Sequence, residues 1–132
     1  MKNIFLVFFI LLVITGCLSA QKPLTNDHIV AEGQLIYERE CLACHMRDGR
    51  GVPGMIPGLL ESVWLQGPND SLIGYILTGG FGPQVQMARF DFLSNEEIAK
   101  VLTYSRLVYL NKRSIISNDE VRKVRNQIEL LE

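Results

Sequence analysis

Two cysteines and a histidine stand close together in the sequence CLACH at residues 41–45. Thiols at this spacing can form a redox-active disulfide, bind zinc together with further ligands, or add to the vinyl groups of a haem. In the last case the adjacent histidine binds the haem iron. The rest of the sequence has to decide among these three chemistries.

A redox disulfide and a zinc site both require surroundings that the sequence lacks. Thioredoxin-like disulfides lie at the start of a helix after a buried strand, whereas CLACH follows a predicted helix. Structural zinc needs four ligands, and with His28 the only other histidine a plausible set is not completed. The favoured interpretation is the c-type haem attachment motif CxxCH, with Cys41 and Cys44 as thioethers and His45 on the iron.

A haem held by His45 has a second axial position, whose occupant decides between electron transfer and catalysis. Met46 adjoins the histidine and cannot reach the opposite face of the ring, and Met55 is only ten residues beyond His45. Met87 comes 42 residues after His45, in a second loop rich in glycine. A flexible thioether there can cross to the far face, so we expect Met87 to be the sixth ligand.

The start of the chain predicts export and a lipid anchor. The uninterrupted apolar run Ile4–Ile14 is too short to span a membrane comfortably but is typical of a signal peptide. It leads into VITGC, which resembles the lipobox of bacterial lipoproteins, where the signal is cut before a cysteine that carries acyl chains. We expect residues 1–16 to be the signal, Cys17 to be lipid-attached and residues 17–26 to be a tether. The alternative is an ordinary cysteine in a signal cleaved near Ala20.

Helical patterns predominate over residues 27–132, which we predict to form one domain. The expected helices cover residues 26–43, a turn within 59–65, then 69–79, 94–109 and a C-terminal extension at about 117–131. Capping boxes open the last two, at Ser94–Glu97 and Ser117–Glu120, and Asn69-Asp70 is expected to cap the middle helix. No stretch alternates as a strand would. The fold class is therefore all-α, with long glycine- and proline-containing loops.

Apolar spacing indicates which helical faces are buried. The face predicted for residues 94–109 consists of Ile98, Val101, Leu102, Ser105, Val108 and Tyr109, and that of the last helix of Val121, Val124, Ile128 and Leu131. The apolar face of the last helix indicates that this helix packs against the domain, rather than serving as a docking element for a partner. Gly33 interrupts the first helix at a cost of about 1 kcal/mol relative to alanine, which suggests that another backbone or ring approaches it closely.

Length and charge exclude several classes of protein. The 132 residues carry 13 Lys and Arg against 14 Asp and Glu, which is typical of one small globular domain and offers no basic patch for nucleic acid. A mature chain of this size has only a modest apolar core. A covalently held apolar cofactor would help to fill it.

Residues from about 27 to 110 resemble a class I cytochrome c. The matching features are Gly33 and Tyr37 in the first helix, CLACH, DGRG, Pro57 with Leu59, Trp64, Gly79, Met87 with Phe90, and LTYSR at 102–106. The resemblance implies a small all-α cytochrome c fold, with helices packed around one covalently bound haem c. It also implies that the first helix crosses the last core helix with Gly33 near residues 102–106.

The same resemblance assigns further residues to the haem. The carbonyl of Pro57 would accept a hydrogen bond from the ring of His45 and so fix its orientation, and Trp64 and Arg50 would contact the haem propionates. The sequence departs from the family pattern at Ala88, where proline often follows the methionine, and at Met46, where a small or polar residue is common.

The function expected from these features is single-electron transfer through a His/Met-ligated haem, without catalysis by the chain itself. The protein would be a monomer anchored by lipid to a bacterial membrane, facing the periplasm. Its electron donor would be a dehydrogenase or quinol-oxidising complex, and its acceptor a terminal oxidase or reductase. If Met87 does not bind, the alternative is a haem enzyme or a gas or redox sensor with an open iron position.

Overall fold

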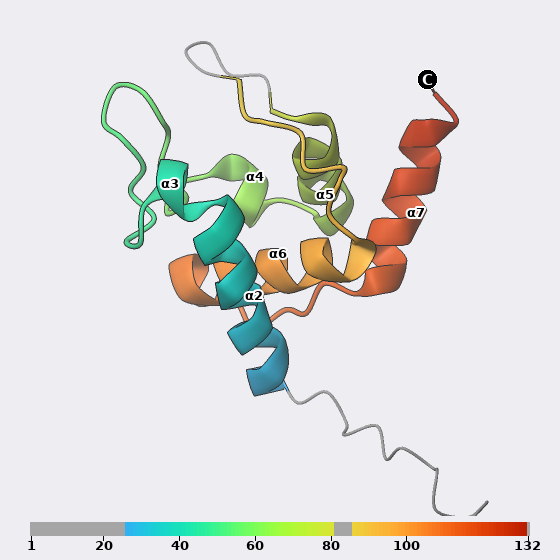
Figure 1. The fold of residues 1–132 in the computed structure, drawn as a ribbon, viewed down its shortest axis with the longest axis horizontal. Helices are drawn as coiled ribbons and strands as arrows, with labels where there is room; N and C mark the ends of the chain where they lie inside the picture. The colour runs from blue at the N-terminus through green and yellow to red at the C-terminus, as the bar shows by residue number, and fades with distance from the viewer. Residues whose placement is uncertain (1–25, 81–85, 132) are drawn as a thin grey trace, which may run out of the picture.

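The computed structural model describes residues 26–80 and 86–131 of the chain (Figure 1). Its helices are α2 (Asn26–Glu40), α3 (Leu42–His45), α4 (Val63–Gln66), α5 (Asn69–Thr78), α6 (Asn95–Leu110) and α7 (Asn118–Glu129). The described residues form no strand, apart from an isolated bridge between Val52 and Ile56. The all-α class expected from the sequence is therefore confirmed. No helix in these two segments combines the length and apolarity needed to cross a membrane.

The predicted signal peptide, Cys17 and nearly all of the predicted tether lie outside the described residues. Helix α2 begins at Asn26, the last residue assigned to the tether. The first helix was expected to continue to about residue 43, but it ends at Glu40 and α3 starts at Leu42. The boundary falls at Cys41, whose φ of −117° departs from helical geometry although its backbone N–H still donates to Tyr37.

Helices α2 and α6 cross in close contact and form the centre of the domain (Figure 1). Gly33 lies at the crossing, where an added Cβ would stand 2.7 Å from Cβ of Tyr104 and closer still to the carbonyl of Lys100. The close approach predicted from this glycine is therefore confirmed. Of its two partners, Tyr104 lies within the expected range of residues 102–106 and Lys100 lies two residues before it.

Helix α6 begins with the predicted capping box, in which Ser94 accepts from the N–H of Glu97 and Glu97 accepts from the N–H of Ser94. Most of its predicted apolar face is buried. Val108 is an exception, with 48% of its surface exposed. The helix ends at Leu110 and is capped by Asn111, which has a left-handed φ of 52° and whose N–H donates to the last-turn carbonyls.

Helix α5 begins at Asn69, so its cap lies one residue earlier in the chain than predicted. Pro68 occupies the capping position, and no side chain caps the helix. Asn69 is engaged elsewhere, because its amide oxygen accepts from Arg106 and its amide nitrogen donates to Glu120 at 2.7 Å. The predicted cap is therefore wrong at Asn69, since tertiary hydrogen bonds take up the side chain.

Helix α7 packs against both α5 and α6 (Figure 1). Its predicted capping box at Ser117 and Glu120 is confirmed. Ile116, Val121 and Val124 are buried and join the core of the domain. Leu131 was predicted on the same face, but the helix ends at Glu129 and Leu131 is 88% exposed.

Candidate functional site

The CLACH segment consists of Cys41, which lies between α2 and α3, and the four residues of α3. Cys41 is partly buried and Cys44 is exposed, and neither is in a disulfide. Burial, reinforced by the negative charge of Glu40, raises the pKa of the Cys41 thiol to about 12. His45 is the last residue of α3 and is partly buried. All three side chains of the motif are thereby presented from one short helical stretch.

Two tyrosines of the domain centre fix the chain that follows His45. The hydroxyl of Tyr37 donates to the carbonyl of Met46 at 2.7 Å, and that of Tyr109 donates to the carbonyl of Arg47 at 3.2 Å. Their rings lie 5.5 Å apart between centroids. Burial raises the pKa of both hydroxyls, so both remain protonated donors. The α2–α6 crossing therefore holds the histidine segment in place, and the role of Tyr109 was not predicted.

The loop after the motif folds back so that Pro57 lies beside His45. Gly51 has a φ of 68°, donates to the carbonyl of His45 at 3.3 Å, and has no room for a Cβ beside the carbonyls of residues 56 and 57. Burial lowers the pKa of His45, while the Pro57 carbonyl acts in the opposite direction. Nδ1 of His45 is buried without a hydrogen-bond partner of good geometry in the described part of the chain. The Pro57 carbonyl is the nearby acceptor, and the hydrogen bond expected between it and the His45 ring stays a prediction.

Two adjoining cavities, each of about 480 Å³, open beside His45. Each lies within the range of roughly 300–1,000 Å³ that is usual for cofactor sites. The residues that line both are Cys41, His45, Pro57, Tyr75, Met87 and Phe90. One cavity extends toward Leu65 and Leu102 in the core, and the other toward Cys44 and Met55 near the surface.

Met87 belongs to a segment of residues 86–94 that precedes α6 and that we call the Met87 strap. Met87 is partly buried and lines both cavities together with His45. Its N–H donates to the carbonyl of Gly80 at 3.0 Å. Gly79, with a φ of 78°, passes so close that a Cβ would lie 2.8 Å from the carbonyl of Met87. The structure thus brings an imidazole and a thioether, from α3 and from the strap, to the same cavities.

The two residues predicted to contact haem propionates lie in different surroundings. Trp64 on α4 lines the core-side cavity and stacks on Tyr75, with ring centroids 4.5 Å apart. Arg50 lines neither cavity, is 76% exposed, and has its guanidinium 3.6 Å from the carboxylate of Asp48. Their contacts with a haem remain predictions. His28 lies away from both cavities on α2, with Nδ1 3.5 Å from Glu32.

Arg106 fixes the position of the α4 segment that contains Trp64, a role that was not predicted from the sequence. It is only 3% exposed, and it donates to the carbonyls of Leu65 at 3.0 Å and Gly67 at 2.6 Å, as well as to Asn69. A guanidinium can satisfy several oxygens at once because its donors form a fixed fork. An arginine among apolar residues of α6 was the available signal, but its partners are carbonyls distant in sequence.

The residues around the cavities fit a covalently attached haem. Cys41 lines both cavities and Cys44 lines the surface-side one, an imidazole and a thioether line both, and the remaining lining is mostly apolar. Such a set suits c-type attachment and axial ligation of iron. Among the described residues no cluster of His, Cys, Asp and Glu offers an alternative metal site.

Comparison with known proteins agrees with this fit. The family model for cytochrome c matches residues 30–106. Cytochrome c-552 of Thermus thermophilus is 30% identical over 113 aligned positions, which cover 72% of this chain and 85% of that protein. The fructose dehydrogenase cytochrome subunit of Gluconobacter japonicus is 31% identical over 71% of this chain, but the match covers only 22% of that longer protein.

A second dehydrogenase subunit gives a similar result. The gluconate 2-dehydrogenase cytochrome c subunit of Pantoea cypripedii is 31% identical over 67% of this chain and 24% of its own length. The matched region includes CLACH, the α2–α6 crossing and Met87. The chain therefore belongs to the cytochrome c family of electron-transfer proteins and carries a covalently bound haem c.

Proposed function

We propose that this protein is a class I, lipid-anchored monohaem cytochrome c that carries single electrons through a His/Met-ligated haem. Cys41 and Cys44 form the thioether bonds, and His45 and Met87 are the axial ligands. The observation that carries the proposal is that His45 and Met87, far apart in sequence, line the same pair of cavities beside Cys41.

The chain's own residues support electron transfer with little rearrangement. The haem, when bound, supplies an iron that alternates between ferrous and ferric states. Tyr37 and Tyr109 hold the segment after His45, and Gly51 holds the loop that bears Pro57. A thioether ligand and apolar walls favour the less charged, reduced state and so raise the midpoint potential. We expect a positive potential.

Ligation by Met87 is favoured over an open iron position. A haem enzyme or sensor would require a free sixth site and a distal group that acts on the bound molecule. Among the described residues His28, the other histidine of the chain, forms its contact with Glu32 and lines neither cavity. Met87, which lines both cavities together with His45, supports ligation over an open position.

The redox partners follow from the relatives and from the predicted anchor. Two relatives are cytochrome subunits of dehydrogenases, so we propose a dehydrogenase or a quinol-oxidising complex as donor. A terminal oxidase or reductase would accept the electron. Acylation of Cys17 would keep the protein, as a monomer, on the periplasmic face of a bacterial membrane, since more than one acyl chain gives stable anchoring. Intact mass of the exported protein, compared with Cys17→Ser, tests the anchor.

The ligation is tested by absorption and redox titration of Met87→Ala. The oxidised wild-type protein should show a far-red methionine-to-iron charge-transfer band, and the variant should lose it. The midpoint potential of the variant should fall by on the order of 0.1 V, within the roughly 0.8 V range that axial ligands span. Met55→Ala, which removes a methionine of the surface-side cavity, is the matched control and should change neither. Equal behaviour of the two variants would refute ligation by Met87.

A further inference from the structure

The Met87 strap is attached to the domain differently at its two ends. Near Met87 it is tied by two backbone bonds, from Met87 to Gly80, just after α5, and from Phe90 to Ile76 within α5, both 3.0 Å long. Farther along, the carbonyls of Asp91 and Leu93 have no place in a helix or strand. Both are instead bonded to the C-terminal helix α7.

A single arginine of α7 makes these bonds. In Arg125, Nη1 donates to the carbonyl of Asp91, Nη2 to that of Leu93 and Nε to Oδ1 of Asn95, each at 2.8 Å. Charge-assisted bonds from a planar guanidinium fix the orientation of their acceptors as well as their distance. Arg125 is partly buried, so water competes less for these bonds than at an exposed site.

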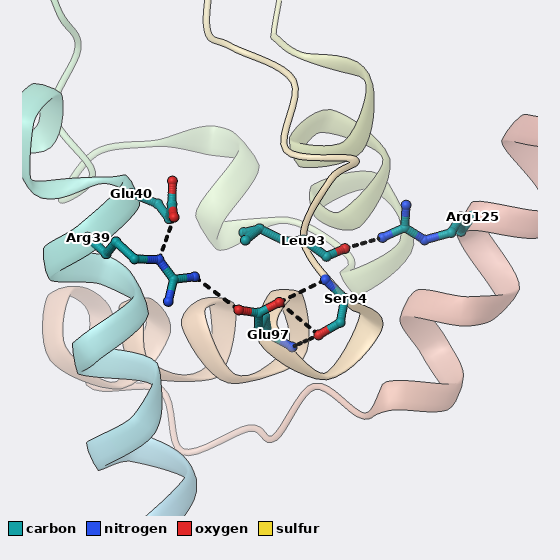
Figure 2. Close-up of polar contacts among 6 residues, drawn as sticks. All are labelled: Arg39, Glu40, Leu93, Ser94, Glu97 and Arg125. Carbon is teal, nitrogen blue, oxygen red and sulfur yellow. Dashed lines mark hydrogen bonds and ion pairs between the residues drawn. The ribbon is translucent and has the colours of Figure 1, made fainter.

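The strap end is also held from the opposite side. Figure 2 shows Leu93 bonded to Arg125, and next to it Ser94 bonded to Glu97. Glu97 in turn accepts from Nη2 of Arg39 at 3.0 Å, and Arg39 also contacts Glu40, the residue before Cys41. The end of the strap thus lies between α7 and the part of α2 that leads into the haem-attachment motif.

We propose that Arg125 is a positioning residue for Met87, and that α7 serves to hold the strap closed over the haem. This inference rests on the proposed ligation of iron by Met87. Two of the three bonds hold the strap itself, at Asp91 and Leu93, and the third holds Asn95, the first residue of α6. Without them the strap is held by fewer contacts from Asp91 onward, and states in which it has opened become more populated. In such states Met87 leaves the iron, and an added ligand can take its place.

The test is imidazole binding by the ferric holoprotein, followed through loss of the far-red methionine band. Because apparent affinity scales with the population of the open state, Arg125→Gln should bind imidazole about tenfold more tightly than wild type. Arg125→Lys keeps the charge but cannot reach three acceptors in one plane, so its affinity should fall between the two.

Two controls separate positioning from general effects. Arg122→Gln removes the same charge from the same helix, at a side chain 59% exposed and paired with Asp119, and should leave imidazole affinity unchanged. Ile98→Val trims a fully buried side chain that lines neither cavity, so it should lower the melting temperature without changing imidazole affinity.

Each outcome decides the inference. Equal imidazole affinity in Arg125→Gln and Arg122→Gln would overturn it. So would an Ile98→Val protein that lost as much melting temperature as Arg125→Gln and gained as much imidazole affinity. If Arg125→Gln does not fold, the comparison of Arg125→Lys with Arg122→Gln decides in the same way. A wild-type protein without the methionine band would overturn both the proposed function and this inference. A band that is present in wild type, absent in Met87→Ala and indifferent to Arg125 would overturn the inference alone.

Discussion

The two sides of the haem cavity are built in different ways. On the histidine side, Tyr37 and Tyr109 of the central α2–α6 crossing hold the chain next to His45. On the methionine side, the strap is tied by two backbone bonds near Met87 and by Arg125 of the outlying helix α7. Substitutions on the first side should therefore lower global stability, whereas substitutions on the second should loosen Met87, the proposed ligand, locally.

The largest expected effect comes from removing the attachment residues on the histidine side. Cys41→Ser combined with Cys44→Ser should abolish covalent attachment, because serine has no thiol that could add to a haem vinyl group. The haem of the variant should then be extracted by acidified organic solvent, and helical content by circular dichroism should fall because the apolar cavity is left unfilled. Haem that remained with the double variant after extraction would show that CLACH is not the attachment site.

The next effect in size concerns the helix crossing behind the histidine side. Gly33→Ala places a Cβ against the carbonyl of Lys100 and Tyr104, and should lower the free energy of unfolding by about 1–3 kcal/mol. The matched control is Gly74→Ala in α5, where a Cβ would meet only a side-chain carbon of Val124 at 3.9 Å. This control should stabilise the protein by about 0.5–1 kcal/mol. Denaturant unfolding measures both, and equal effects would contradict the account of the crossing.

A smaller change sharpens the contrast between the two sides. Tyr37→Phe removes the hydrogen bond to the Met46 carbonyl and should cost about 1 kcal/mol of unfolding free energy. Imidazole affinity of the ferric protein should stay at the wild-type value, which is the reverse of the pattern expected for Arg125→Gln. A Tyr37→Phe protein that gained imidazole affinity as strongly as Arg125→Gln would remove the distinction between the two sides.

The smallest expected effect is a pH dependence at the junction of the strap with α6. Hydrogen bonds from the Ser94 backbone and from Arg39 hold the pKa of Glu97 below its usual value. A lowered pKa contributes stability that is present above the unfolded value of about 4.3 and is lost as the pH falls through the folded value. The stability difference between wild type and Glu97→Gln should therefore be greatest near neutral pH and shrink below about pH 4.

A charge control accompanies the pH series. Glu129→Gln removes the same charge from an exposed position at the end of α7. Its stability difference from wild type should be small throughout. A difference between wild type and Glu97→Gln that stayed constant from neutral pH into acid would contradict the role of the Glu97 carboxylate at this junction.

The parts of the fold that were predictable depend on short-range sequence. The CxxCH motif spans five residues, and the capping boxes at Ser94 and Ser117 span four each, so their geometry is fixed locally. Gly33 was informative because a glycine in a helix interior is costly unless something approaches it. These features identified the family and the histidine side of the cavity.

The parts that were not predictable depend on partners distant in the chain. Asn69 looked like a helix cap, but Arg106 and Glu120 take its side chain. Arg125 reads in sequence as one more polar residue of an amphipathic helix, and its acceptors 30 to 34 residues earlier include two main-chain carbonyls, which carry no sequence signal. The methionine side of the cavity is therefore where structure adds most to the sequence.

The central claim is that His45 and Met87 hold the iron from the two sides. Near-infrared magnetic circular dichroism of the ferric holoprotein at neutral pH tests it most directly, because the position of the charge-transfer band reports the pair of axial ligands. We predict the band of histidine–methionine coordination in wild type and its loss in Met87→Ala. A wild-type band at the position for histidine with water, hydroxide or a second nitrogen ligand would contradict the claim.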